Sequence, residues 1–115
     1  MKYLAMILLC MLVFFLLKNR FFDTTDYRAL LSNGAIIVDV RSPSEFSTGY
    51  IENSLNIPVG ELTNKLEYFK GKNQTIITCC ASGMRSGQAT SIAKSRGINA
   101  YNGGDWNNLN RKLNK

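Results

Sequence analysis

A strand, a short loop and a helix follow one another in residues 75–89, which read TIITCCASGMRSGQA. The β-branched run of residues 75–79 predicts a strand that is buried on both faces. It ends in two adjacent thiols, Cys79 and Cys80, and a helix is expected to begin near Arg85. The backbone N–H groups of such a loop and the N-terminus of the helix attract anions and stabilise a thiolate. The stretch therefore predicts a nucleophilic cysteine in an anion-binding loop.

Strand and helix signals alternate on both sides of this stretch. The other expected strands are residues 35–40, 54–58 and 98–101. The expected helices are residues 24–34 after a Thr cap, 42–49 with a Ser-Pro-x-Glu capping box, 61–71, 85–97 and a last helix capped by Asp105. This order predicts an α/β fold with a small, mostly parallel sheet and helices on both of its faces. In such sheets ligands bind beyond the carboxyl ends of the strands, which is where the cysteine loop falls.

The N-terminal segment is apolar. Residues 3–17 contain no charge, and as a helix they would reach about 22 Å, short of the roughly 30 Å of a bilayer core. Lys18 can snorkel to the interface, which makes a tight span feasible. We therefore expect residues 1–20 to form a hydrophobic helix that anchors a domain of residues 21–115 in a membrane by a single pass.

A cleaved signal segment is the alternative for these residues, and it would leave an exported, periplasmic protein. Lys, Asn, Arg and two Phe follow the apolar run, so no small-x-small cleavage site is present there. Lys2 and the terminal amine balance Lys18 and Arg20. The positive-inside rule therefore leaves the side of the membrane open.

The amino-acid composition limits the substrates, catalytic mechanisms and metal sites that the chain can have. The net charge is +6, and residues 21–115 hold eleven Lys and Arg against eight Asp and Glu. This mildly basic balance suits a small anionic substrate, and the dense basic stripe that nucleic-acid binding needs is missing. The chain has no histidine, which excludes Ser-His-Asp and Cys-His catalysis and most zinc sites. Cys10 lies in the apolar segment, and the spacing of the cysteines predicts no metal site. We expect no metal and no cofactor.

Two cysteines compete for the role of nucleophile. Counted from Cys80, the loop is Cys-x-x-x-x-Arg with Gly83 three positions on. Counted from Cys79, it has the spacing of cysteine phosphatases, but Ser82 stands where those enzymes commonly have glycine. The pattern favours Cys80 and leaves Cys79 as a packing residue at the strand end. A phosphatase or arsenate-reductase-like enzyme that uses Cys79 and a non-catalytic binding module are the alternatives.

Three motifs resemble the rhodanese family, in the same order along the chain. CASGMRS (residues 80–86) resembles the family's active-site loop, Cys-x-x-Gly-x-Arg-Ser. IIVDVRSPSEFSTGYIENSLNIP (36–58) resembles its Asp-Val-Arg strand end, Pro-x-Glu-Phe helix and Gly-His-Ile segment, and NGGDW (102–106) approximates its late Gly-Gly-x-x-Trp region. The resemblance runs from about Asp23 onward. Tyr50 stands where the family usually has histidine; that position is chiefly structural, so we expect only local packing and hydrogen bonding to differ.

The resemblance implies a sulfurtransferase. The Cys80 thiolate would attack the outer sulfur of a donor such as thiosulfate and pass it, as a persulfide, to cyanide or to a thiol, including a protein thiol. Arg85 would attract the anionic donor. From the residues themselves, we expect Asp39 and Arg41 to support the site by an ion pair that ties the strand end to the neighbouring loop, with a direct contact of Arg41 to the substrate as the alternative. Met84 stands where some thiosulfate-specific relatives have a cation, so another donor is also compatible. The implied substrate-binding residues are Ala81, Ser82, Gly83, Met84, Arg85 and Ser86. A monomer is expected.

Overall fold

A parallel sheet forms the centre of the domain. The structure, a computed structural model, describes residues 2–21 and 25–115. In this part of the chain, four parallel strands form one sheet in the order β2-β1-β3-β4. The strands are β1 (Ile36–Asp39), β2 (Leu55–Asn56), β3 (Ile76–Cys80) and β4 (Ala100–Asp105). The predicted parallel sheet is confirmed, and β3, which leads into the cysteine loop, has a neighbour on each side.

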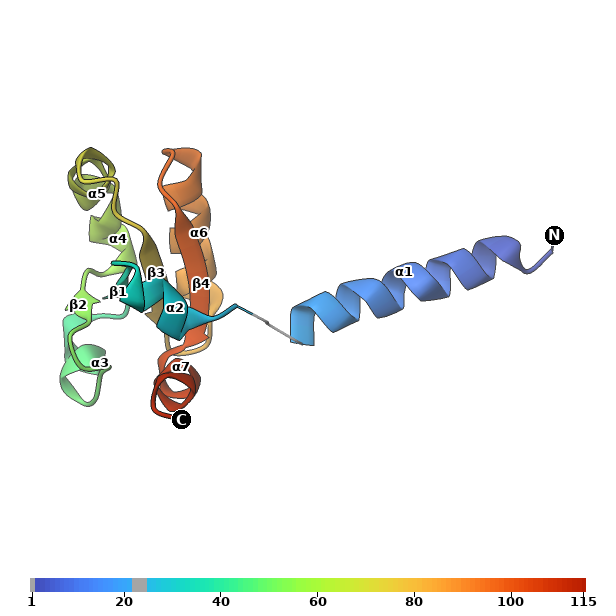
Figure 1. The fold of residues 1–115 in the computed structure, drawn as a ribbon, viewed down its shortest axis with the longest axis horizontal. Coiled ribbons are helices and arrows are strands. Elements are labelled where there is room, and N and C mark those ends of the chain that lie inside the picture. Colours follow the sequence, from blue (N-terminus) through green and yellow to red (C-terminus); the bar gives the residue numbers. More distant parts are fainter. Residues whose placement is uncertain (1, 22–24) are drawn as a thin grey trace.

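Helices cover both faces of the sheet, as predicted. In chain order the helices are α1 (Leu4–Phe21), α2 (Tyr27–Ser32), α3 (Pro43–Ser47), α4 (Val59–Leu62), the 3-10 turn η1 (Thr63–Lys65), α5 (Leu66–Gly71), α6 (Met84–Ser95) and α7 (Trp106–Leu113). Side chains of α4, α5 and α6 pack on one face, and those of α2 and α7 pack on the other. In Figure 1, α2 lies in front of the sheet and α6 lies behind it.

Side-chain caps begin three of the helices. The Ser42 hydroxyl accepts the backbone N–H of Glu45 at 3.3 Å, and the Glu45 carboxylate accepts the backbone N–H of Ser42, so the predicted capping box of α3 is confirmed. Asp105 accepts a backbone N–H of the first turn of α7 at 2.8 Å, also as predicted. The prediction of a Thr cap before α2 is wrong. Asp26 is the N-cap of this helix, and its carboxylate accepts the backbone N–H of Ala29. The expected helix start at residue 24 lies outside the described residues.

The helix expected at residues 61–71 is divided into shorter pieces. It begins earlier than predicted, as α4, and is interrupted by η1 before α5. The interruption contains a threonine and an asparagine, which are poor helix formers, and this favours a tighter 3-10 turn. The apolar side chains on which the prediction rested are all buried, namely Leu62, Leu66 and Phe69.

The last strand is longer than predicted. It was expected at residues 98–101, but β4 continues through Gly103 to Asp105. A pair of glycines usually indicates a turn. Here a Cβ atom at Gly103 would lie only 2.8 Å from the backbone oxygen of Thr78 and 2.8 Å from Leu109. The glycine therefore serves a close approach between β4 and its neighbours.

The two cysteines of β3 point to opposite faces of the sheet, as alternation along a strand requires. Cys80 packs in the cluster that contains Val38 and Ala89. Cys79 packs in the cluster that contains Ile37 and Leu109. Neither cysteine is exposed to solvent.

The N-terminal segment forms helix α1, as predicted. Its large apolar side chains between Tyr3 and Leu17 are exposed. Across residues 2–21 and 25–115, no helix combines the length and the apolar character that a membrane span requires. The single-pass anchor, the boundary between residues 20 and 21 and the monomeric state stay predictions.

Gly103→Ala is expected to destabilise the domain by about 2 kcal/mol, because the added methyl group overpacks the contact between β3, β4 and α7. The matched control is Gly60→Ala in α4, where a Cβ atom would meet nothing within 4 Å. That control should be neutral or slightly stabilising, because alanine favours a helix over glycine by up to about 1 kcal/mol. Urea unfolding followed by circular dichroism measures both variants. Equal midpoints would contradict the close approach at Gly103.

Candidate active site

A buried ion pair lies at the carboxyl edge of the sheet. Asp39, which pairs with Cys79 in the parallel register, is fully buried. Its carboxylate accepts Nη2 of Arg41 at 2.7 Å and Nε of Arg41 at 3.0 Å to each oxygen. Arg41 is itself only 3% exposed. Such a pair is stable in the interior because both charges are compensated and hydrogen-bonded.

The Arg41 guanidinium also fixes the segment that contains α3. Its Nη1 donates to the backbone oxygen of Glu45 at 3.3 Å, and its Nη2 donates to the backbone oxygen of Gly49 at 2.7 Å. The guanidinium carbon lies 4.6 Å from the centroid of the Trp106 ring. These contacts give Arg41 and Asp39 a structural role beside the loop, and their support of the reaction stays a prediction.

The loop after β3 closes around the sulfur of Cys80. The backbone N–H of Gly83 donates to Cys80 Sγ at 2.9 Å. Gly83 has a φ of +98°, a left-handed conformation that glycine adopts without strain, and it is the N-cap of α6. Ser86 Oγ lies 3.4 Å from the sulfur and accepts from the thiol. The loop therefore surrounds the sulfur with hydrogen-bonding groups from its own backbone and from the first turn of α6.

These groups lower the pKa of the Cys80 thiol below its ordinary value. Burial by itself raises that pKa. The side-chain contact with Ser86 and the backbone N–H groups of Ser86, Ser82 and Gly83 outweigh the effect of burial, because the amides donate to the ionised sulfur. The result is a thiol that ionises more readily than a free cysteine, as a nucleophile requires.

Cys80 is nevertheless fully buried beneath the loop. Ala81 and Ser82 above it are exposed, and the Met84 side chain is 82% exposed. The sulfur thus lies below a thin cover of loop backbone.

Asn102 is part of this site, although the sequence did not single it out for a role in catalysis. Its Oδ1 accepts from Ser86 Oγ at 2.7 Å and from the backbone N–H of Gly104 at 3.0 Å. Its Nδ2 donates to the backbone oxygen of Gly83 at 3.4 Å. Asn102 therefore holds both the hydroxyl and the loop glycine that contact the sulfur. Only its position beside the glycines of β4 could have indicated this from the sequence.

Arg85 forms an ion pair with Glu45 of α3. Its Nη1 donates to Oε1 at 2.7 Å and its Nη2 donates to Oε2 at 2.9 Å, so both ends of the guanidinium fork contact the carboxylate. Hydrogen bonds from Arg85 and Ser42 lower the pKa of Glu45 to about 2. Sequence reasoning assigned Glu45 only a capping role and did not find this second contact. The role of Arg85 in attracting the donor stays a prediction.

Cys79 has the opposite environment. Burial raises the pKa of its thiol far above the usual range, and the negative charge of Asp39 raises it further, opposed in part by Arg41. Its side chain packs with the apolar residues of the face that α2 and α7 cover. These observations support a packing role and oppose a phosphatase that uses Cys79 as nucleophile.

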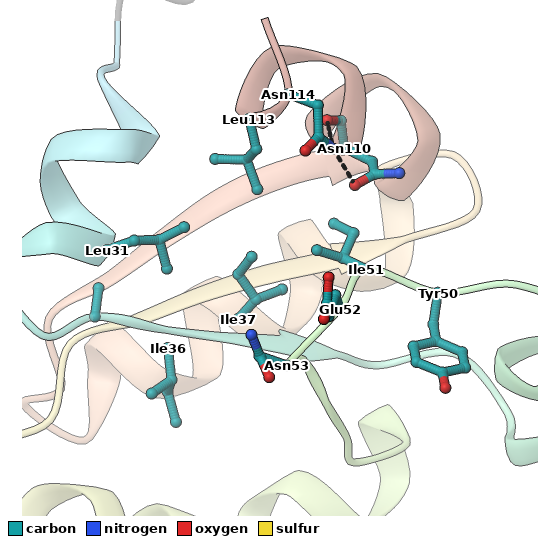
Figure 2. A pocket seen from close by; sticks show the side chains of 11 residues that line it. Leu31, Ile36, Ile37, Tyr50, Ile51, Glu52, Asn53, Asn110, Leu113 and Asn114 are labelled. Atoms are coloured by element: carbon teal, nitrogen blue, oxygen red, sulfur yellow. Dashed lines mark hydrogen bonds between the residues drawn. The ribbon is translucent and has the colours of Figure 1, made fainter.

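A separate groove of about 570 Å³ lies between the end of α2, the start of β1, the segment after α3 and α7. Figure 2 shows the side chains that line it, and none of them belongs to the cysteine loop. Tyr50 lies at one end of this groove and stacks on Phe46 with ring centroids 4.4 Å apart. Tyrosine in place of the family's usual histidine is thus accommodated by local packing.

No group of three or more metal-ligating side chains is present among the described residues. The arrangement at the sheet edge is instead an ionisable thiol among amide and hydroxyl donors at the start of a helix. This arrangement is typical of enzymes that form a covalent intermediate on cysteine.

Comparisons with known proteins agree with this class. The family model of the rhodanese-like domain matches residues 23–108. A tRNA sulfurtransferase of Thermoplasma acidophilum is 36% identical over 67 residues, which cover 58% of this chain but 13% of that protein. A human thiosulfate:glutathione sulfurtransferase is 36% identical over 86 residues, covering 63% of this chain and 75% of that protein. The solved structure of a rhodanese with anions from E. coli has a TM-score of 0.58 at 28% identity, covering 64% of this chain and 88% of that one.

The chain belongs to the rhodanese-like family. The match covers most of the domain, and the two relatives named above are sulfurtransferases. These relationships support a rhodanese-like enzyme, as the sequence motifs predicted.

Replacing Ser86 with alanine tests the origin of the thiol's acidity. Without the hydroxyl, the pKa of Cys80 should rise, and alkylation of Cys80 by iodoacetamide at neutral pH should slow. A hydrogen bond to a charged group contributes about 1.5–3 kcal/mol, so we expect a slowing of about tenfold or more. The measurement is the pH profile of alkylation, with tandem mass spectrometry to separate Cys80 from Cys79.

Ser95→Ala is the control for this experiment, because Ser95 lies at the other end of α6 and its hydroxyl donates to Ile92. It should leave the pH profile of Cys80 unchanged. A Ser86→Ala profile that coincides with the wild-type one would show that the hydroxyl does not stabilise the thiolate.

Proposed function

We propose that this protein moves a sulfane sulfur from a donor such as thiosulfate to a thiophilic acceptor, through a persulfide on Cys80. The observation that carries the proposal is the 2.9 Å hydrogen bond from the Gly83 amide to Cys80 Sγ, in a loop that lowers the pKa of that thiol. The acceptor is cyanide in an assay and a low-molecular-weight or protein thiol in the cell. Relatives named for thiosulfate support a sulfane donor of this kind.

In the first half-reaction, the Cys80 thiolate attacks the outer sulfur of thiosulfate. A bond forms between Sγ and that sulfur, the S–S bond of thiosulfate breaks, and its electron pair leaves with sulfite. In the second half-reaction, an acceptor thiolate attacks the outer sulfur and Cys80 leaves as a thiolate. Both steps are displacements at sulfur by a group that is already ionised, so neither needs a histidine base.

The loop has two positions for sulfur in this scheme. In the resting structure the Gly83 amide contacts Sγ itself. When the outer sulfur is added, the loop would shift outward, and the amides from Ala81 to Ser86 would donate to the new terminal sulfur. The exposure of Ala81 and Ser82 supports such a shift, since few contacts oppose it.

Intact-mass measurement tests the proposal. After incubation with thiosulfate, the wild-type protein should gain the mass of one sulfur atom and lose it again when a thiol is added. Cys80→Ser should abolish the gain because the nucleophile is removed. Cys79→Ser should retain it, since that side chain packs on the other face of the sheet. A gain that survives in Cys80→Ser, or no gain with thiosulfate or an organic persulfide, would contradict the proposal.

We also propose that residues 3–17 attach the protein to a membrane. The support is the row of exposed apolar side chains on α1, which water solvates poorly. The side of the membrane is open. Processing of residues 1–20 as a signal segment is the alternative, and the intact mass of the purified protein distinguishes the two.

A flotation experiment tests the attachment. The full chain should float with phosphatidylcholine vesicles, and Leu8→Lys/Leu12→Lys should remain at the bottom of the gradient, because each lysine costs about 2.5–3.5 kcal/mol at the centre of an apolar helix. The control is Tyr68→Lys, at an exposed residue of α5, which should float like the wild type. A wild-type chain that does not float, or a lysine variant that does, would refute membrane attachment by this segment.

A further inference from the structure

The guanidinium of Arg85, beside the active-site loop, is already paired with the carboxylate of Glu45. Both terminal nitrogens of Arg85 donate to the two carboxylate oxygens of Glu45, at 2.7 and 2.9 Å. This is the two-pronged geometry in which an arginine would otherwise hold an oxyanion. An anionic donor that approaches the loop therefore competes with Glu45 for the same two guanidinium nitrogens of Arg85.

Glu45 is held in this position from its other side. Its Oε1 accepts the Ser42 hydroxyl at 3.0 Å and the Ser42 backbone N–H at 3.3 Å. The carboxylate is thus part of the cap of α3 and cannot swing away without opening that cap. Because its pKa is lowered to about 2, it carries its charge at every pH at which the enzyme would be assayed.

We propose that Glu45 determines donor preference, by occupying the Arg85 fork and disfavouring the thiosulfate dianion relative to an organic persulfide, R–S–SH. This inference rests on the proposed function. A dianion gains little from a cation that is already neutralised, and it is repelled by the carboxylate beside it. A persulfide carries at most one charge at its sulfur, and it has no oxyanion that would bind the Arg85 guanidinium.

The loop also offers an apolar contact to the organic group of such a donor. Met84 lies next to Arg85 in the chain, and its side chain is 82% exposed. Methionine adapts to irregular apolar partners, which suits a donor group of variable shape. A small inorganic anion makes no use of that side chain.

The reaction with this donor is balanced without a further reagent. The Cys80 thiolate attacks the outer sulfur of R–S–SH, and a bond forms between Sγ and that sulfur. The S–S bond of the donor breaks, and its electron pair leaves with the thiolate R–S⁻. The proton stays on the transferred sulfur, so the enzyme holds Cys80–S–SH.

Glu45→Gln tests the inference, because glutamine keeps the size and capping ability of the side chain while it removes the charge. The second-order rate of sulfur loading on Cys80 is measured by quenched-flow intact mass, with thiosulfate and with 2-hydroxyethyl persulfide as donors. For thiosulfate, we expect loading to become about tenfold faster in low salt, since repulsion of a double charge is removed. For the persulfide, we expect a change of about threefold or less, and higher salt should shrink the thiosulfate gain.

Glu67→Gln is the matched control, since it removes one acidic charge from the exposed side of α5 and should change neither rate appreciably. Equal effects of Glu45→Gln on both donors, or slower loading from thiosulfate, would overturn the inference while loading itself still supports the proposed function. If neither donor loads sulfur onto the wild-type Cys80, the proposed function fails, and the inference fails with it. Thermal unfolding of the variants verifies that each is folded.

Discussion

The hydrogen bond from the Gly83 amide to the Cys80 sulfur is the contact on which the site depends. A fully buried thiol in an apolar cluster ordinarily ionises poorly, and the neighbouring Cys79 illustrates this, since burial raises its pKa. Cys80 is equally buried, yet the loop and the first turn of α6 provide enough donors to reverse the direction of the shift. The pKa values of two adjacent cysteines of one strand thus shift in opposite directions, because the strand directs one of them toward the amides.

The position of that loop depends in turn on the buried pair of Asp39 and Arg41. The Arg41 guanidinium donates to the backbone oxygens of Glu45 and Gly49, and so holds α3 and its exit against the carboxyl edge of the sheet. Glu45 of α3 then contacts Arg85 at the start of α6. A chain of charge-assisted contacts therefore runs from the interior of the sheet to the mouth of the loop. Removal of one partner at the buried end would leave the other charge uncompensated, which is far more costly than loss of an exposed ion pair.

The local features of this molecule could be predicted from the sequence. The capping box at Ser42, the parallel strands and the divergent directions of Cys79 and Cys80 follow from short-range rules of spacing and alternation. Contacts between distant segments could not be predicted from the sequence. The ion pair of Glu45 with Arg85 joins residues forty positions apart, and Asn102 meets Ser86 only because β4 lies beside β3. The glycines of β4 suggested a turn, since the sequence does not reveal that a neighbouring backbone approaches them.

The closed loop explains how one set of amides could serve both states of a sulfur carrier. With no sulfur added, the amides stabilise the thiolate and the loop covers it. With an outer sulfur added, the same donors would stabilise the terminal persulfide, whose charge lies one bond further out. The site then needs only a small displacement between the two states, and left-handed Gly83 is the residue whose backbone allows it at least cost. A residue with a Cβ atom at position 83 would strain the closed loop and, because the added atom would lie 3.6 Å from Gly104, would also contact the strand behind it.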